Sequence, residues 1–554
     1  MRLWGIGHGL PFVYYGDEHW HFVRGAVMLF DDFEPPKFIN PSGFTELLFL
    51  VDVVWYRGAG AAKHALATDP GSIFLLGRVV GALLGTAGVW LLLVAGRRLL
   101  DARAGALAAA LLAVAFLPVF YSHLALDDGP TVAPVALCMV GVAGIVRRGR
   151  IVDFALAGAG GGLAAGTKYN AGAVLLAAAG AGAVLALDGR RRAAAVGLGV
   201  VALSAGLAFL VTTPYALLDH QRFLTDLRLQ RKWANSGVLV GETQNSGYAY
   251  YAWVLTWGFG WLPLVAAVGG AVHMLARNRR LAAVLLPAPL ALFGFMGGQF
   301  RYFGRWMVPI VPMLCLIAAY GTVQAIDAIA RRRPPLRTAA LAGSVVLLLA
   351  QGVISAVHLD RVLARPDTRN TARAWLFAHV PRGNGVVLEP FLPTQASAIG
   401  TRWLVRGPPS TALRPGWVRH WRLPHSHYQR TLRPGLIDEY QRLGYCWVIT
   451  GSTETDLAYV GDWSQRHYAA ARAYYRRLTR DATVAFQDSP FAARAAPIAP
   501  ARTPVRYQAD WSFDYYPAAY RRPGPVITFY RLHGGRCRAQ SVTASPIPRA
   551  PGIE

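Results

Sequence analysis

The sequence predicts a polytopic α-helical membrane protein that carries a separate C-terminal domain. Its 554 residues are 54% hydrophobic and only 16% charged, whereas soluble proteins carry about 25% charged residues. About ten apolar runs follow one another between residues 73 and 357, many of them near the length of about 20 residues that crosses a bilayer. From residue 358 to 554 the apolar runs are short and alternate with helical patterns, which predicts an exported α/β or α+β domain with its own core.

The predicted transmembrane domain, residues 73–357, consists of spans joined by short polar connections. We expect the spans at about residues 73–96, 104–121, 130–146, 152–166, 170–187, 192–212, 250–274, 281–298, 306–325 and 338–357. Glycines at four-residue spacing, Gly158, Gly162 and Gly166, predict close packing against a neighbouring helix.

Residues 1–72 form a first loop ahead of these spans. The stretch Phe44–Tyr56 is apolar but short, and it contains Glu46 and Asp52. We therefore expect an interfacial helix rather than a spanning one.

Arginine clusters fall in every second connection and predict the orientation of the chain. They are Arg97-Arg98 with Arg103, Arg147-Arg148 with Arg150, Arg190-Arg191-Arg192, Arg277 with Arg279-Arg280, and Arg331-Arg332-Arg333. The positive-inside rule places these clusters in the cytoplasm. The other connections then face outside, at residues 17–72, 122–129, 167–169, 213–249 and 299–305, together with the tail. Because this places residue 1 outside as well, we expect one further span upstream of Met1.

The net charge of +26 is divided between short basic clusters in the connections, which are typical of cytoplasmic loops, and the C-terminal part, which is itself basic. No basic stripe with interleaved aromatic residues is present, so we expect no nucleic-acid partner. Lysine is rare, at Lys37, Lys63, Lys168 and Lys232 alone, and all four lie in the predicted outer connections. Richness in Ala, Gly and Arg indicates a GC-rich genome, which favours Arg codons.

The predicted outer connections collect the polar residues that an enzyme needs. They hold Asp17-Glu18, Asp127-Asp128, Lys168-Tyr169, and Arg301-Tyr302 with Arg305. Any one of them alone is as often an interfacial anchor. Together they supply what sugar transfer from a lipid-linked phosphate requires. A carboxylate takes the proton of the acceptor hydroxyl, and Lys or Arg stabilises the phosphate that leaves.

A divalent metal is the alternative use of the first acidic stretch. Asp17, Glu18, His19 and His21 carry suitable ligand atoms, but their spacing matches no standard metal-site pattern. We therefore assign no metal ligands, and no cofactor is certain.

Four stretches within about residues 1–325 resemble one known superfamily. They are Gly16-Asp17-Glu18 followed by Pro35-Pro36, Ser122 to Asp128, Gly162 to Tyr169, and Arg301-Tyr302 before Pro309 and Pro312. This set resembles the polytopic GT-C glycosyltransferases that include protein O-mannosyltransferases and lipid A aminoarabinose transferases. Such enzymes are inverting and use a polyprenyl-phosphate sugar at the outer face of the membrane that they span. The absent first span, the insertion after Lys37 and the different tail depart from the family pattern.

The resemblance implies roles for individual residues. Asp17 matches the aspartate taken as catalytic base, with Glu18 beside it. Asp128 matches the second-loop acid better than Asp127 does, and it would help to hold acceptor or donor. Lys168 and Arg301, with the adjacent Tyr302, fall where the donor phosphate would bind.

We therefore predict an inverting hexosyl- or pentosyltransferase of the bacterial cytoplasmic membrane. It would move a sugar from a polyprenyl-phosphate carrier to a protein, lipid or glycan acceptor at the outer face. The alternative is a transporter or flippase of lipid-linked sugars. Transporters place their polar groups near the bilayer midplane, often in repeated halves, whereas here these groups gather at one face. If the tail is exported, Cys446 and Cys537 can form a disulfide.

Overall fold

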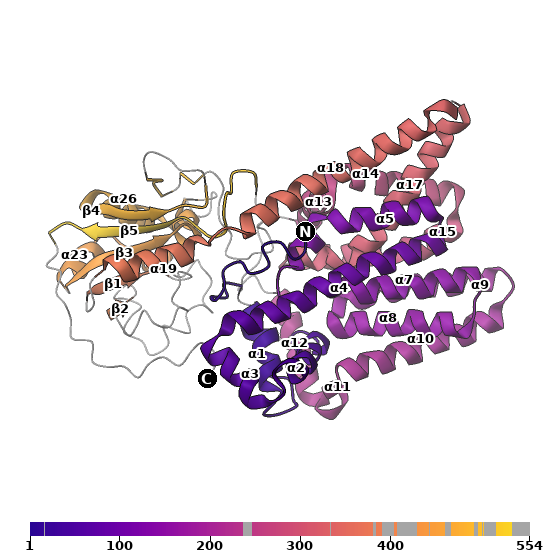
Figure 1. Ribbon diagram of the computed structural model, residues 1–554, viewed down its shortest axis with the longest axis horizontal. Coiled ribbons are helices and arrows are strands. Elements are labelled where there is room, and N and C mark those ends of the chain that lie inside the picture. Colours follow the sequence, from indigo (N-terminus) through magenta and orange to yellow (C-terminus); the bar gives the residue numbers. More distant parts are fainter. Residues whose placement is uncertain are drawn as a thin grey trace.

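A bundle of helices and a smaller part built around a β-sheet make up the computed structural model (Figure 1). The residues it describes are 1–15, 17–235, 246–332, 334–380, 384–389, 404–406, 429–442, 444–459, 467–491, 497–500, 502–503 and 517–534. The predicted fold class is confirmed, because the chain is mostly helical and a small sheet lies in its C-terminal region.

Each predicted apolar run of the transmembrane domain is helical. In chain order these helices are α4 (Pro70–Leu99), α5 (Ala102–Val114) with α6 (Phe116–Tyr121), α7 (Val132–Arg147), α8 (Ile151–Thr167), η2 (Tyr169–Val174) with α9 (Leu175–Leu187), α10 (Arg191–Thr212), α13 (Gly247–Leu255) through η3 (Thr256–Gly260) to α14 (Trp261–Arg277), α15 (Arg279–Leu285) with α16 (Pro287–Gly297), η4 (Gly304–Ile310) with α17 (Val311–Arg332), and α18 (Arg337–Leu363).

Six helical stretches of the described chain are long and apolar enough to cross a membrane. A seventh is added if α15 and α16, which are bent by 45° at their junction, count as one span. Helices α5, α7 and α8 are apolar but shorter. The protein is therefore a multi-pass membrane protein, while the number of about ten spans stays a prediction.

The two ends of the bundle differ in charge. Arginine-rich turns meet at the end away from the sheet, where Arg103 pairs with Asp327 at 2.8 Å and Arg280 pairs with Asp188 at 2.7 Å. Figure 1 shows α9 and α15 at this end. The acidic and basic residues singled out in the sequence lie in connections at the opposite end. This separation agrees with the positive-inside pattern, and the direction in which the bundle lies in a membrane stays a prediction.

The glycines of α8 allow α10 to approach closely, as their spacing predicted. A Cβ added at Gly158 would lie 2.4 Å from the carbonyl oxygen of Val201, and one added at Gly162 would lie 2.2 Å from that of Ala205. Because neither distance is sterically possible, only glycine permits this packing. The prediction of close helix packing is confirmed.

The first loop folds into η1 (Glu18–Phe22), a π-helical turn, followed by three helices. These are α1 (Val23–Met28), α2 (Gly43–Tyr56) and α3 (Ala59–Thr68). The connection between α1 and α2 is hydrogen-bonded to α12 (His220–Ala234), which follows α11 (Tyr215–Leu218). Helix α2 covers the predicted interfacial stretch, and its Val54 and Trp55 are 77% and 68% exposed. Exposed apolar side chains of this kind fit a membrane surface.

The C-terminal domain contains a five-stranded mixed sheet in the order β2-β1-β3-β5-β4. Its strands are β1 (Gly385–Leu388), β2 (Leu404–Arg406), β3 (Tyr445–Gly451), β4 (Ala482–Asp488) and β5 (Ile527–Leu532). Strands β1, β2 and β3 are parallel, and β4 and β5 are antiparallel to their neighbours. The sheet and the helices that flank it agree with the predicted α/β or α+β domain. Cys446 is disulfide-bonded, and Cys537 lies outside the described residues.

Helices cover both faces of this sheet. Helix α19 (Thr368–His379) packs on one face through Ala372 and Leu376, and α23 (Leu436–Arg442) and α26 (Ala469–Asp481) pack on the other. Helix α19 begins five residues after the last membrane helix, so it is the first element of the C-terminal domain and the one nearest to the bundle in sequence.

A buried ion pair fastens the first loop to α4. Glu18 and Arg78 are both almost fully buried, and their side chains meet in two hydrogen bonds of 2.7 and 2.9 Å. Arg78 also donates to the carbonyl oxygens of Ile6 and His8, each at 2.8 Å. Glu18 accepts a further bond from the backbone N–H of Ala125 at 2.9 Å. The pair therefore joins three segments of the chain.

We expect Glu18→Ala to destabilise the protein by about 3–5 kcal/mol, because it leaves the Arg78 guanidinium buried without its counter-ion. Thermal unfolding of the purified protein in detergent measures the change. Glu34→Ala is the control, since Glu34 pairs with the exposed Arg222 and its loss should cost less than about 1 kcal/mol. Equal melting temperatures for the two variants would contradict this role of the pair.

Candidate active site

Asp17 lies at the start of η1, where its carboxylate faces a cation from a distant part of the chain. Its Oδ2 accepts a hydrogen bond from Nη2 of Arg305 at 2.9 Å, and Arg305 belongs to η4. Its Oδ1 lies 3.9 Å from Nε2 of His21, one turn further along. The Asp17 side chain is 39% exposed, whereas that of Arg305 is 11% exposed. Asp17 therefore combines a fixed partner with access from outside.

The surrounding charges keep Asp17 ionised. Burial by itself would raise the pKa of its carboxyl, but Arg305 lowers that pKa, with smaller contributions from His21, Arg301 and Lys168, and the net pKa lies below its ordinary value. The pKa of His21 is also lowered, first by burial and then by nearby cations, against the effect of Asp17. At neutral pH Asp17 is thus a carboxylate and His21 a neutral imidazole.

A second acidic group reaches the same place from the connection between α6 and α7. Asp128 lies 2.6 Å from Nζ of Lys168, and Asp127 lies 3.2 Å from it. Burial raises the pKa of Asp127 to about 7, although the charge of Lys168 opposes this shift. The Oδ2 of Asp128 also lies 3.8 Å from Nε of Arg305. Arg305 therefore bridges the first-loop acid Asp17 and the second-loop acid Asp128.

Arg301 and Tyr302 occupy different positions from Arg305. The guanidinium of Arg301 lies 4.4 Å from the ring centroid of Phe303, and that of Arg305 lies equally far from the same ring. Tyr302 is 2% exposed and packs against Tyr250, with ring centroids 5.0 Å apart. The resemblance implies a role for the Arg301-Tyr302 pair, whereas the direct contact with Asp17 comes from Arg305.

Glu18 does not share the surroundings of Asp17. Its carboxylate is 0% exposed, and both of its oxygens are engaged by Arg78. It is the neighbour of Asp17 in sequence but turns into the protein. We therefore assign Glu18 to holding the loop, and among the first-loop acids we keep Asp17 alone for chemistry.

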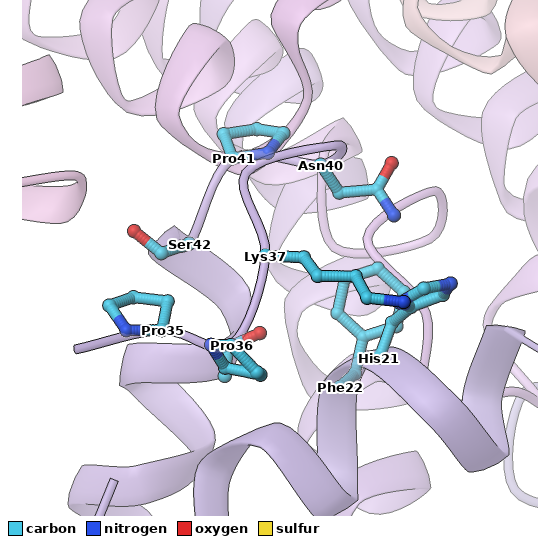
Figure 2. A pocket seen from close by; sticks show the side chains of 9 residues that line it. His21, Phe22, Pro35, Pro36, Lys37, Asn40, Pro41 and Ser42 are labelled. Atoms are coloured by element: carbon cyan, nitrogen blue, oxygen red, sulfur yellow. The ribbon is translucent and has the colours of Figure 1, made fainter. Parts of the chain in front are cut away.

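A small pocket adjoins Asp17 by way of His21. It is lined by His21, Phe22, Pro35, Pro36, Lys37, Asn40, Pro41, Ser42 and Thr45. Figure 2 shows the Lys37 side chain extending toward His21, with the amide of Asn40 on the same side. The sequence argument gave Lys37 no role, although its rarity as one of four lysines was a signal.

Metal ligands are not gathered in the described part of the chain. No three His, Cys, Asp or Glu side chains among its residues are placed to hold a metal ion. The carboxylates of the site face Arg305 and Lys168 instead.

The family model described as dolichyl-phosphate-mannose-protein mannosyltransferase matches residues 71–217. The chain resembles this family. The predicted resemblance to this superfamily is thereby confirmed over residues 71–217. The matched stretch contains the second-loop acids and Lys168, while Asp17 and Arg305 lie outside it. Comparison with curated protein sequences gives no match.

Two solved structures are similar to this chain at low sequence identity. One is ArnT from Cupriavidus metallidurans bound to undecaprenyl phosphate, with 15% identity, covering 68% of this chain and 71% of that one, and a TM-score of 0.44. The other is the archaeal oligosaccharyltransferase AglB from Archaeoglobus fulgidus in complex with an inhibitory peptide and a dolichol-phosphate. It shows 13% identity, covers 86% of this chain and 69% of that one, and has a TM-score of 0.47.

Arg305→Gln should raise the pKa of Asp17, because it removes the largest of the charges that lower it. A water-soluble carbodiimide reacts with protonated carboxyl groups, so labelling of Asp17 can be followed against pH by mass spectrometry. We expect the labelling midpoint to move to higher pH. Arg301→Gln is the matched control and should move it less. Identical midpoints for Arg305→Gln and the unchanged protein would remove Arg305 as the controlling charge.

Proposed function

We propose that the protein is an inverting glycosyltransferase that uses a polyprenyl-phosphate sugar as donor. The observation that carries this proposal is the placement of Arg305 between Asp17 and Asp128. It puts an ionised, half-exposed carboxylate beside cations suited to a phosphate, at one end of a membrane bundle. A hydrophobic carrier lies in the membrane and presents its phosphate at the membrane surface. Asp17 and these cations would meet the phosphate there, at the end of the bundle.

In the proposed reaction Asp17 takes the proton of the acceptor group. The acceptor oxygen or nitrogen then forms a bond to the anomeric carbon of the sugar, while the bond from that carbon to the phosphate oxygen breaks. The electron pair of the broken bond stays on the carrier phosphate, whose negative charge Arg305 and Lys168 stabilise. One displacement of this kind inverts the anomeric configuration.

The same cations link donor binding to the strength of the base. In the structure described here Arg305 is held by Asp17 and Asp128, and Lys168 is held by Asp127 and Asp128. A donor phosphate would compete for Arg305. Once Arg305 turns to the phosphate, the charge that lowers the pKa of Asp17 is partly neutralised and Asp17 becomes a stronger base. Donor binding thus prepares Asp17 for the acceptor.

The pocket beside His21 is the proposed place for the polar part of the donor. Lys37 supplies a positive charge, and Asn40, Ser42 and Thr45 supply hydrogen-bonding groups. These groups suit the hydroxyls of a sugar and the charge of a phosphate. Because the matching family is named for dolichyl-phosphate mannose, mannose is the first sugar to test.

The proposed location is the outer face of a bacterial cytoplasmic membrane. The arginine-rich turns would face the cytoplasm, and the site with the C-terminal domain would face outward. The disulfide at Cys446 supports this orientation, because disulfides persist in oxidising compartments. The acceptor, whether protein, lipid or glycan, would approach from that side.

We expect Asp17→Asn to lower transfer by more than about a hundredfold, the range for loss of a general base. Purified protein in lipid nanodiscs is given polyprenyl-phosphate mannose and a bacterial envelope fraction, and release of polyprenyl phosphate is measured. Asp31→Asn is the control, since Asp31 is an exposed acid of the same loop that pairs with Lys63.

Retention of more than about a tenth of the rate by Asp17→Asn would remove Asp17 as base. The transporter alternative has a different outcome. Movement of the lipid-linked sugar across a liposome membrane, with no covalent product and no effect of Asp17→Asn, would support that alternative.

Lys37→Ala should raise the KM for donor by about tenfold with little change in kcat, because a charge-assisted contact contributes to binding in both ground and transition states. The side chain is exposed, so the fold should tolerate its loss. Lys63→Ala provides the matched control, since Lys63 is an exposed lysine of the same loop outside the pocket. Unchanged donor KM for Lys37→Ala would exclude the pocket as a donor site.

A further inference from the structure

The first residues of the chain lie between the bundle and the C-terminal domain. In Figure 1 the N-terminal segment runs from the bundle toward the sheet. Asn370 of α19 contacts this segment with both ends of its side-chain amide. Its Oδ1 accepts from the hydroxyl of Tyr14 at 2.5 Å, and its Nδ2 donates to the carbonyl oxygens of Gly9 and Leu10 at 3.1 and 3.4 Å.

Tyr14 is held from a second direction by Arg369. The guanidinium of Arg369 lies 3.7 Å from the centroid of the Tyr14 ring, a distance at which a cation is attracted by the ring face. Asp367 fixes that guanidinium with two hydrogen bonds of 2.8 and 2.6 Å and also accepts from the Arg369 backbone N–H. Burial raises the pKa of the Tyr14 hydroxyl, so this hydroxyl stays protonated and remains a donor.

The next residue along the chain contacts the proposed active site. Tyr15 is 4% exposed, its hydroxyl accepts a hydrogen bond from Nη1 of Arg305, and its ring lies 5.7 Å from the Arg305 guanidinium. Nη2 of the same guanidinium donates to Asp17. Two consecutive tyrosines therefore connect α19 on one side with the Arg305–Asp17 pair on the other.

We propose that Asn370 is a positioning residue for sugar transfer. By holding Tyr14 it fixes Tyr15, Tyr15 fixes the Arg305 guanidinium, and Arg305 sets the position and the pKa of Asp17. The C-terminal domain would then act on the base through this contact and not only as an exported appendage. The kinetic part of this inference rests on the proposed function, whereas the structural link does not.

The local backbone supports a specific fit at this contact. Gly9 has a φ of +73°, and a Cβ added there would lie 3.1 Å from the ring of Tyr14. The backbone carbonyl of Gly9 is also a partner of Asn370. A side chain at this position would be strained and would press on the tyrosine that Asn370 holds.

The test compares three variants of the full-length protein in lipid nanodiscs. Tyr14→Phe deletes only the hydroxyl that donates a hydrogen bond to Asn370, and Asn370→Ala deletes the side chain that accepts this bond. Tyr475→Phe is the control, because the Tyr475 hydroxyl donates to Glu389 at 2.7 Å within the core of the C-terminal domain. Hydrogen–deuterium exchange of the peptide over residues 17–22 reports the order of the Asp17 turn without any substrate.

We expect faster exchange of that peptide in Tyr14→Phe and Asn370→Ala but not in Tyr475→Phe. With polyprenyl-phosphate mannose as donor, kcat should fall by about tenfold, the equivalent of one hydrogen bond, while donor KM stays unchanged. The acid limb of the kcat/KM profile, which reports the free enzyme, should move to higher pH, since a displaced Arg305 lowers the pKa of Asp17 less. A purely structural contact would lower stability without moving this limb.

Unchanged exchange and an unchanged acid limb in both Tyr14→Phe and Asn370→Ala would overturn the inference. If the unchanged protein releases no polyprenyl phosphate from any donor, the proposed function fails, and the exchange measurement alone decides the link. Faster exchange in those two variants then supports it, and exchange equal to that of Tyr475→Phe rejects it.

Discussion

The buried ion pair between Glu18 and Arg78 is the contact on which the geometry of the site depends. Removing two charges from water is costly, and the cost is offset only when the remaining hydrogen-bonding positions are filled. Here two backbone carbonyls and the N–H of Ala125 fill them. The first loop, the second loop and α4 are thereby tied at one point. Asp17 is next to Glu18 in the chain, and Asp127 is two residues after Ala125, so the tie brings both acids to the same end of the bundle.

The charges of the site are balanced against one another within a small space. The carboxyl groups of Asp17, Asp127 and Asp128 face the cations of Lys168 and Arg305. The pKa of Asp127, about 7, leaves that group partly protonated at neutral pH. Such a cluster is stable without a ligand because each buried charge has a partner. A bound phosphate would also change the electrostatic environment of every group in the cluster, because it adds one or two negative charges. The alternative of an apolar site would leave a phosphate without stabilisation at the membrane surface.

The sequence predicts where the helices lie and which connections share one end of the bundle, because hydropathy and the alternating arginine clusters carry that information directly. It also predicts a mixed α and β domain after the spans, because short apolar runs there alternate with helical patterns. It did not separate Asp17 from Glu18, since adjacent acids look alike until burial distinguishes them. Nor did it rank Arg305 above Arg301. Which of these two arginines faces the first loop depends on how η4 and the residues before it fold.

The close packing at the glycines of α8 extends from the bundle to the residues that line the pocket beside His21. A Cβ added at Gly166 would lie 2.0 Å from Oγ1 of Thr212, and one added at Gly43 would lie 2.5 Å from the Gly166 carbonyl oxygen. Ser42, which lines the pocket, donates to the carbonyl oxygen of Thr212 at 3.2 Å. The ends of α8 and α10 and the start of α2 are therefore in direct backbone contact. A change in bilayer thickness tilts spanning helices, so the lipid composition of the membrane becomes a determinant of the shape of this pocket.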